Sequence, residues 1–354
     1  MMLEKINAIL ENYKQLILVQ GIEEQLRWKE LENNIEIPVQ YQLEFIKYQT
    51  TYFQEKDEFF YELSLIIYSG VHDIGLWPIC IKKNCEGWQI GSLGGEIIKP
   101  LFYEKMIPNV KTRRKYFRIL LKFLYDLSQE MNIKSLHFSE SISNSVDLWH
   151  RILMEEGAEI ESVTHELYYN LMLPVHEADK KMHKKVRQDI NKGYKYYRYE
   201  VVCSESKNID DMIELFRKYH IEISGRETRS KKTWEKQAEG IKKNKDFAVY
   251  LYDLETGDLH GASLFTVTNH FCYYSVAAYN RDRFDRPIGH MVQDIAINYL
   301  RKIGVKWYVI GDRYYAADHV DSKMLSISKY KEAFATDILP KMHLKISIED
   351  IELI

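Results

Sequence analysis

The chain has 354 residues, enough for about two domains of ordinary size or for one large α/β domain. Hydrophobic residues make up 45% of it and charged residues 29%, a composition that is typical of a folded globular protein and excludes a disordered or fibrous one. The formal net charge is −3, so the chain as a whole has no field that would attract polyanions.

Tyrosine is the unusual component. The chain has 26 tyrosines beside 14 phenylalanines and 6 tryptophans, so tyrosine outnumbers the other aromatic residues combined. A tyrosine ring favours burial while its hydroxyl group needs a partner, which suits half-buried strands and wet clefts.

Residues 1–50 predict helices, because Leu and Ile recur there at spacings of three and four. Residues 1–20 interleave charges with apolar side chains, which is typical of an amphipathic helix and unlike a secretory signal. Pro38 is expected near the end of this helical region.

Two features favour a cytoplasmic protein without a metal site. The longest weakly polar run, at 63–81, is interrupted by polar and turn residues such as His72 and Pro78, which is wrong for a membrane span. The 4 cysteines are too scattered for a disulfide framework, and their spacing does not fit a zinc site. We therefore expect reduced, structural cysteines and no bound metal.

The rest of the first half predicts a mixed α/β arrangement. Runs of β-branched and aromatic residues at 60–68, 75–81 and 87–93 are separated by turn residues and indicate antiparallel strands. An amphipathic helix at 110–131 is followed by a short strand at 133–138.

A second helix is expected at 145–156 in the first half. It should end before Gly157, where a left-handed cap is favoured. A further strand is expected at 166–173.

The second half repeats this order of elements. Strands are expected at 246–252, 259–268 and 271–279, the first two joined in a hairpin by a Glu-Thr-Gly-Asp turn. A helix at 287–303 then leads into a strand at 306–310, as the helix at 110–131 leads into its own strand. A repeat period of about 170 residues indicates a domain duplication.

Between the halves, the segment at 177–195 is rich in Lys, Arg and His and predicts a linking helix. We place the domain boundary near Pro174, which divides the chain into residues 1–174 and residues 175–354. The second domain is expected to carry the active site.

The order of strand hairpin, central strand, Gly-containing turn, helix and splayed parallel strand resembles the GNAT (N-acetyltransferase) fold. Two such units resemble the tandem-GNAT architecture of the Fem-type (FemABX-like) peptidyltransferases and their relatives in the acyl-CoA N-acyltransferase superfamily. The basic segment at 185–193 is similar to the Arg-x-x-Ile-x-Lys motif at the start of that family's second domain. The segment at 322–334 is similar to a late Lys-x-x-x-Ile-x-x-[Phe/Tyr]-Lys-x-x-Phe signature, and the matching residues are Lys323, Ile327, Tyr330, Lys331 and Phe334.

This resemblance covers roughly residues 60–340 and is architectural in the first half. It implies an α/β (α+β) fold of two GNAT-like domains in tandem. Each domain would have a mixed, mostly antiparallel sheet flanked by helices.

The resemblance also implies a site for the pyrophosphate of an acyl-CoA co-substrate, at the turn that opens the helix after the central strand. The nearest match to that turn has Met291 where a small residue is expected, and its candidate binding residues are Arg286, Ile288, Gly289 and His290. Backbone amides and the helix dipole favour a phosphate there. A plain helix N-terminus is the alternative interpretation.

Acyl transfer needs a deprotonated acceptor, stabilisation of the developing oxyanion and a proton for the leaving group. The resemblance suggests Lys331 as a cation near the acyl carbonyl or a phosphate. Asp312 is a candidate to orient or deprotonate the acceptor, His290 to act as a base, and Tyr274 and Tyr279 to donate protons or hydrogen bonds. Each of these residues also has a purely structural alternative. Lys331 could be a solvated lysine, Asp312 a turn residue and His290 a surface histidine, and the two tyrosines could serve only in packing.

Four further residues are candidates for substrate binding. Arg226 and Arg229 belong to a Gly-containing charged loop, and Arg313 and Tyr314 follow the predicted strand at 306–310. Guanidinium groups hold phosphates and carboxylates, although a solvated loop would have the same composition. The basic run at 180–195 could bind tRNA, but a charge run is more often a solvated face, so nucleic acid is not the expected partner.

The sequence thus favours a cytoplasmic acyltransferase that moves an acyl group, acetyl in the simplest case, from acyl-CoA to an amine or hydroxyl. The acceptor would be a small molecule such as a sugar or a cell-envelope precursor. Two alternatives stay open. One is an aminoacyl-tRNA-dependent peptidyltransferase of peptidoglycan precursor synthesis, and the other is a non-catalytic binding protein with a GNAT fold.

Overall fold

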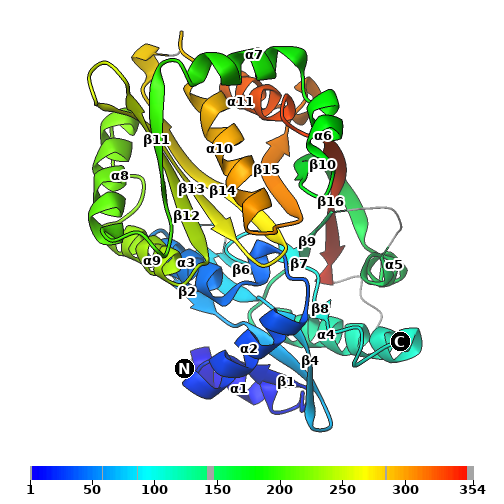
Figure 1. Cartoon of the computed structure of the whole chain (residues 1–354). Coiled ribbons are helices and arrows are strands. Elements are labelled where there is room, and N and C mark those ends of the chain that lie inside the picture. The colour runs from blue at the N-terminus through cyan, green and yellow to red at the C-terminus, as the bar shows by residue number, and fades with distance from the viewer. Residues whose placement is uncertain (1, 58, 86, 142–146, 284, 349–354) are drawn as a thin grey trace. The chain divides into compact units, whose positions relative to one another are not determined.

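The computed structural model describes residues 2–57, 59–85, 87–141, 147–283 and 285–348 (Figure 1). The chain forms two compact units: unit 1 comprises residues 1–164 and 340–354, and unit 2 comprises residues 165–339. The sequence places the division at 174/175 instead and does not anticipate the return of the C-terminal segment to unit 1. Within the described residues, no helix combines the length and the apolar character that crossing a membrane requires.

Unit 1 begins with helices separated by short extended segments. The helices are α1 (Met2–Leu10), α2 (Ile22–Asn34) and α3 (Leu43–Gln54), with strand β1 (Leu16–Leu18) and the 3₁₀ helix η1 (Val39–Tyr41) between them. The prediction of one amphipathic helix over residues 1–20 is therefore wrong beyond Leu10. The apolar residues of β1 pair antiparallel with β3 (Leu65–Ser69), and this long-range pairing overrides the local helical spacing.

Two small antiparallel sheets follow in unit 1, ordered β1-β3-β4-β8 and β2-β5-β6. Their remaining strands are β2 (Phe59–Glu62), β4 (His72–Trp77), β5 (Cys80–Asn84), β6 (Gly87–Gly91) and β8 (Leu101–Phe102). The apolar runs at 60–68 and 75–81 are each divided between two strands. The second run divides at Pro78, which has no backbone N–H to donate to a sheet.

The long helix of unit 1 is α4 (Val110–Glu130), as predicted, and Asn109 caps it by accepting a hydrogen bond of 2.8 Å from the Lys111 amide. It leads into β9 (Ser135–Ser141), α5 (Leu148–Glu155) and β10 (Glu159–Asn170). The predicted start of α5 at Ser145 lies outside the described residues, and Gly157 has the expected positive φ of 83°.

A strand that the sequence analysis misses completes unit 1. This strand, β16 (Asp337–Ser347), pairs antiparallel with β9, and β7 (Ile97–Ile98) pairs parallel with β9 on the other side. Its Leu344 and Ile346 join the core under α4 and α5. Large aromatic rings fill that core, including Trp149, which lies 5.1 Å from Phe117 between ring centres.

A buried acid in unit 1 predicts a pH-dependent stability. Glu140 is only 5% exposed, and its Oε2 lies 3.1 Å from His150 Nδ1. Burial, assisted by Asp147, raises the pKa of Glu140 to about 7, while burial lowers the pKa of His150. A neutral carboxyl can therefore donate to a neutral imidazole at this place.

Because the folded-state pKa of Glu140 exceeds the unfolded value near 4.5, the folded state binds the extra proton between about pH 4.5 and 7. The stability from this proton is present below that window and is lost as the pH rises through it. Between these two pH values the parent loses unfolding free energy, and Glu140→Gln should reduce that loss by about 1–3 kcal/mol. Urea denaturation at a series of pH values measures it. The exposed Glu159→Gln should leave the slope unchanged, and an unaltered slope in Glu140→Gln would refute the assignment.

Unit 2 opens with two helices, α6 (Val175–Lys181) and α7 (Lys184–Gly193), where the sequence predicts one helix at 177–195. They are separate because Met182 and His183 have extended backbone angles. A sheet follows in which the strands of this unit lie in the order β11-β12-β13-β14-β15-β10. Its strands in unit 2, besides β10, are β11 (Tyr197–Val202), β12 (Asp246–Asp253), β13 (Leu259–Val267), β14 (Phe271–Tyr279) and β15 (Trp307–Arg313).

Helices cover both faces of this sheet (Figure 1). On one face, α8 (Ile209–Ser224) and α9 (Lys231–Lys242) pack over a core that includes Phe216 and Tyr250. On the other face, α7 and α10 (Ile288–Lys302) enclose a core with Phe265 and Tyr308, which α11 (Ser322–Glu332) and its following turn join. The strands at 246–252, 259–268 and 271–279 and the helix at 287–303 are thus confirmed, with end shifts of a residue or so.

Candidate functional site

The central strands of unit 2 separate partway along their length. β14 and β15 pair in parallel at three positions, from Phe271–Trp307 to Tyr273–Val309. Beyond that point β14 stays with β13, and β15 stays with β10. The resemblance to the GNAT fold predicts this separation, and the side chains just past it are those that can meet a substrate.

Asp312 and Arg313 are the last residues of β15, where the sequence analysis expects a connection after the strand. Both pair with β10, Asp312 opposite Glu166 and Arg313 opposite His165. Asp312 is therefore a strand residue, and its alternative interpretation as a turn aspartate is wrong.

Lys331 lies where the two strands separate. Its Nζ is 5.3 Å from the centre of the Tyr274 ring. A Cβ atom at Gly311 would collide with this Nζ, and Gly311 has a φ of 132° that side-chain-bearing residues rarely adopt. A glycine at this position of β15 thus provides the space for the lysine ammonium group.

The ammonium group of Lys331 is half-buried and, among the described residues, has no hydrogen bond or ion pair. Burial lowers the pKa of Lys331, and the nearby charge of Asp312 opposes the effect. An incompletely solvated, unpaired cation favours any negative charge that is brought to it or develops beside it.

A chain of three hydroxyl groups connects β13 to β14 on this face. Ser263 Oγ lies 2.8 Å from Tyr279 Oη, which lies 2.7 Å from Tyr274 Oη. Burial raises the pKa of both tyrosines, so both are protonated at neutral pH and able to donate. The sequence analysis identifies the tyrosines but misses Ser263, because no motif marks a serine inside a strand.

Tyr330, next to Lys331, packs against the start of α10. A Cβ at Gly289 would lie 2.5 Å from Tyr330 Oη, so Gly289 permits this close contact. The hydroxyl is buried, and none of the described residues gives it a hydrogen-bond partner. Burial raises its pKa, so it stays protonated.

The turn that opens α10 holds the four candidates for donor binding. Arg286 Nη1 lies 2.5 Å from Asp253 Oδ2, and its guanidinium is 4.6 Å from the Tyr196 ring centre. The Ile288 side chain is buried in the core, and its amide donates to the Arg286 carbonyl at 2.9 Å. The amides of Gly289 and His290 belong to the first helical turn, where intrahelical partners are lacking.

The His290 side chain lies apart from the hydroxyl chain, between α7 and α11. Its Nε2 is 3.7 Å from Asp189 Oδ2, and its ring centre is 5.1 Å from that of Tyr330. Burial lowers the pKa of His290, with Asp189 opposing the effect, so the neutral ring that a base requires is favoured.

Arg313 and Tyr314 hold neighbouring protein groups. Arg313 Nε donates to Glu332 Oε2 at 2.7 Å, which joins β15 to α11. Tyr314 Oη donates to Asp312 Oδ2 at 3.1 Å, and burial raises the pKa of Tyr314 to about 12. The tyrosine therefore orients the Asp312 carboxylate beside Lys331.

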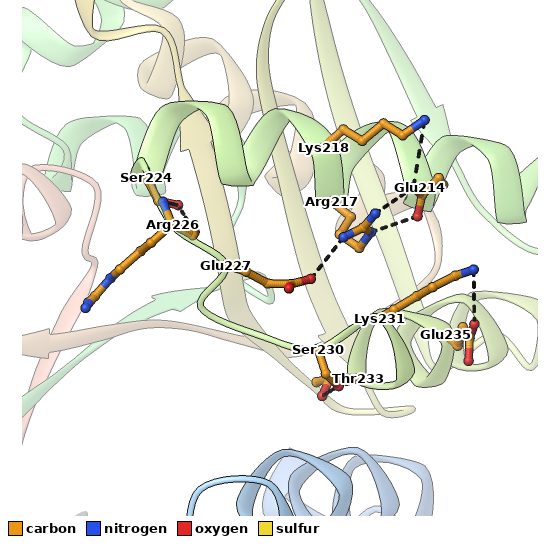
Figure 2. A network of polar contacts seen from close by, with 10 residues as sticks. All are labelled: Glu214, Arg217, Lys218, Ser224, Arg226, Glu227, Ser230, Lys231, Thr233 and Glu235. Atoms are coloured by element: carbon orange, nitrogen blue, oxygen red, sulfur yellow. Dashed lines mark hydrogen bonds and ion pairs between the residues drawn. The ribbon is translucent and has the colours of Figure 1, made fainter.

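Arg226 and Arg229 lie elsewhere, in the connection between α8 and α9. Arg217 Nε lies 2.8 Å from Glu214 Oε2, and Arg217 Nη1 lies 2.9 Å from Glu227 Oε1. Figure 2 shows this bridge and the Arg226 side chain, which points away from it. The Arg229 guanidinium lies 5.8 Å from the Trp234 ring centre. This connection is on the α8 and α9 side of the sheet, whereas Lys331 is on the α10 and α11 side.

The structure thus brings Lys331, Tyr274, Tyr279 and Asp312 together and places His290 and the two loop arginines apart. In the described part of the chain, no group of three or more His, Cys, Asp or Glu side chains could hold a metal ion.

No family model matches the chain, and no curated protein matches it either. Among solved structures it is similar to FemX, with a TM-score of 0.68 and 10% identity over 93% of this chain and 96% of that one. It is also similar to L-PGS from Bacillus licheniformis, with a TM-score of 0.55 and 12% identity over 96% and 90% of the two chains.

A tandem GNAT protein from the clavulanic acid biosynthesis pathway has a TM-score of 0.50 and 10% identity over 94% of this chain and 98% of that one. At such identities the likeness concerns the fold alone. The chain therefore has the tandem GNAT fold that it shares with FemX, in agreement with the resemblance of its sequence.

Proposed function

We propose that unit 2 is an acyltransferase that moves an acyl group from acyl-CoA to an amine or hydroxyl of a small molecule. The observation that carries the proposal is the unpaired, half-buried ammonium of Lys331 at the separation of β14 and β15. A preorganised positive charge at such a place stabilises an oxyanion that develops beside it.

In the proposed reaction the acceptor atom attacks the thioester carbonyl carbon, and Lys331 faces the oxygen on which negative charge develops. Asp312, oriented by Tyr314, receives the proton of the acceptor. The carbon–sulfur bond breaks, and the thiolate takes a proton from Tyr274. Tyr279 and Ser263 hold the Tyr274 hydroxyl in their hydrogen-bond chain, and Tyr274 regains a proton from solvent after the products leave, when Asp312 releases the one that it received.

The first turn of α10 is the proposed place for the donor pyrophosphate. The amides of Gly289 and His290 and the helix dipole suit an anion. Arg286 is held by Asp253, so it would contribute to donor binding only by giving up that ion pair.

Acetyl-CoA should raise the melting temperature of the protein saturably in a thermal-shift measurement, and free thiol should appear when amines or alcohols are added. A ligand at 100 times its dissociation constant adds about 2.7 kcal/mol to the unfolding free energy, which is easily detected. The control is S-acetylpantetheine, which keeps the thioester but lacks the phosphates of acetyl-CoA and should stabilise the protein less.

The same measurement tests the rival functions. Stabilisation by aminoacyl-tRNA with a steep salt dependence, and none by acyl-CoA, would favour the peptidyltransferase. Stabilisation by acyl-CoA without thiol release to any acceptor would favour a binding protein. If millimolar acetyl-CoA leaves the melting temperature unchanged, the proposal fails.

A further inference from the structure

Unit 2 contains a cavity of about 680 Å³ on the α8 side of its sheet. The C-terminal half of α8, the start of β13 and the residues after β14 line it. This volume is within the range of small-molecule sites in proteins. It does not include Lys331 or the hydroxyl chain, which lie on the other side of the sheet.

Two buried polar side chains line the cavity. Tyr219 and His260 are each 7% exposed. Tyr219 Oη and His260 Nδ1 have no hydrogen-bond partner among the described residues. A buried polar atom without a partner carries a desolvation cost that a bound ligand could remove.

Neighbouring groups lie close to both atoms but form no hydrogen bond with them. The Asn280 amide, which lies beside the Tyr219 hydroxyl, already donates to the His260 carbonyl at 2.9 Å. His260 Nδ1 lies 3.4 Å from Asp253 Oδ2, outside hydrogen-bonding geometry. Burial raises the pKa of Tyr219, so its hydroxyl remains a donor at neutral pH.

The rim of the cavity is acidic. It has three exposed carboxylates, and none of them forms an ion pair with a described residue; they belong to Glu222, Asp258 and Asp282. The rim cations are Arg281 and Lys218, and Lys218 Nζ already lies 3.8 Å from Glu214 Oε1 (Figure 2). Glu214 does not line the cavity. The excess of unpaired negative charge favours a cationic ligand.

From this arrangement we infer that the cavity binds a small primary amine that also carries a hydroxyl or carbonyl oxygen. Its ammonium group contacts the rim carboxylates, and its oxygen accepts a hydrogen bond from Tyr219 Oη. The inference does not depend on acyl transfer, since it concerns other residues on the opposite face of the sheet.

Isothermal titration calorimetry at pH 7 and low salt tests the inference, with serinol and D-glucosamine as probes. Each probe is paired with its N-acetyl derivative, which keeps the oxygens and removes the charge. We expect saturable binding of the amines and at least roughly ten-fold weaker binding of the derivatives, as loss of a charge-assisted contact predicts. No saturable binding of either amine up to millimolar concentration, or equal binding of amine and derivative, would overturn it.

Variants locate the binding in this cavity. Glu222→Gln, Asp258→Asn and Asp282→Asn should each weaken amine binding by up to about five-fold, and their combination by considerably more. Glu235→Gln, on exposed α9 surface outside the cavity, is the matched control and should bind as the parent does. Unchanged affinity in a folded triple variant would place any binding elsewhere and refute the assignment.

Tyr219→Phe tests the proposed hydrogen bond to the ligand with a substitution that should not disturb folding. Because the Tyr219 hydroxyl has no partner among the described residues, its removal should leave the melting temperature of the ligand-free protein unchanged or slightly higher. Amine binding should nevertheless weaken by about five-fold or more. Full affinity in this variant would contradict the proposed hydrogen bond.

Discussion

Lys331→Met should lower kcat/KM for acyl transfer by roughly 10²–10³, the usual effect of removing one oxyanion-stabilising group. Methionine keeps most of the side-chain volume and removes the charge. The ammonium group of Lys331 forms no hydrogen bond or ion pair with a described residue, so the substitution removes only its contact with the Tyr274 ring and the fold should persist. The measurement is thiol release from acetyl-CoA once an acceptor is identified.

Lys329→Met is the matched control, because Lys329 is an exposed basic residue of the same helix, α11. Its activity should equal that of the parent. Burial lowers the pKa of Lys331, so the activity that depends on its protonated form should fall at a lower pH than a solvated lysine would allow. Undiminished activity in Lys331→Met, with the melting temperature unchanged, would remove Lys331 from the catalytic residues.

Phe265→Ala should destabilise unit 2 by about 3–5 kcal/mol, because the truncation of a fully buried ring leaves a cavity. Phe265 is fully buried and stacks on Phe247, with 4.8 Å between ring centres and 9° between planes. It also lies 5.4 Å from the Tyr274 ring centre and 6.0 Å from that of Tyr308. The ring thus supports the tyrosine that Lys331 contacts.

Hydrogen exchange of the β13 and β14 amides is the suitable measurement, since a chain of two units need not unfold in a single transition. Phe265→Leu, which fills part of the space, should cost about 1–2 kcal/mol and serves as the graded control. Equal exchange rates in the Ala variant and the parent would show that the ring contributes little to the stability of these strands.

The tyrosine excess in the composition has a structural explanation in unit 2. Tyr274, Tyr279 and Tyr330 gather beside Lys331 on one face of the sheet, and Tyr308 lies buried in the same core. Tyr219 lies on the other face, in the wall of the cavity. Burial of each ring is favourable because the ring is apolar, but the hydroxyl group still requires a hydrogen-bond partner. Only the assembled sheet determines which group lies close enough to be that partner.

The helices and strands with strong local patterns are predictable from sequence. The apolar spacing of α4 and α10 and the turn residues between β12 and β13 specify these elements without distant contacts. The residues flanking Lys331 in α11 carry a motif, so the candidate lysine is also identifiable. In contrast, the segments β1 and β16 are strands only because distant strands pair with them.

By itself, the sequence determined the helices and strands that have strong local patterns and, through its resemblance to the tandem GNAT architecture, the fold and the candidates Lys331, Asp312, Tyr274 and Tyr279, because spacing and motifs are local properties. The tertiary structure alone decided that Asp312 belongs to a strand, that Ser263 joins the tyrosines and that Asp253 engages Arg286. It also decided that Tyr219 and His260 line a cavity with acidic residues from three segments. Such contacts join residues far apart in the chain, and their energies depend on burial and distance that no local pattern records.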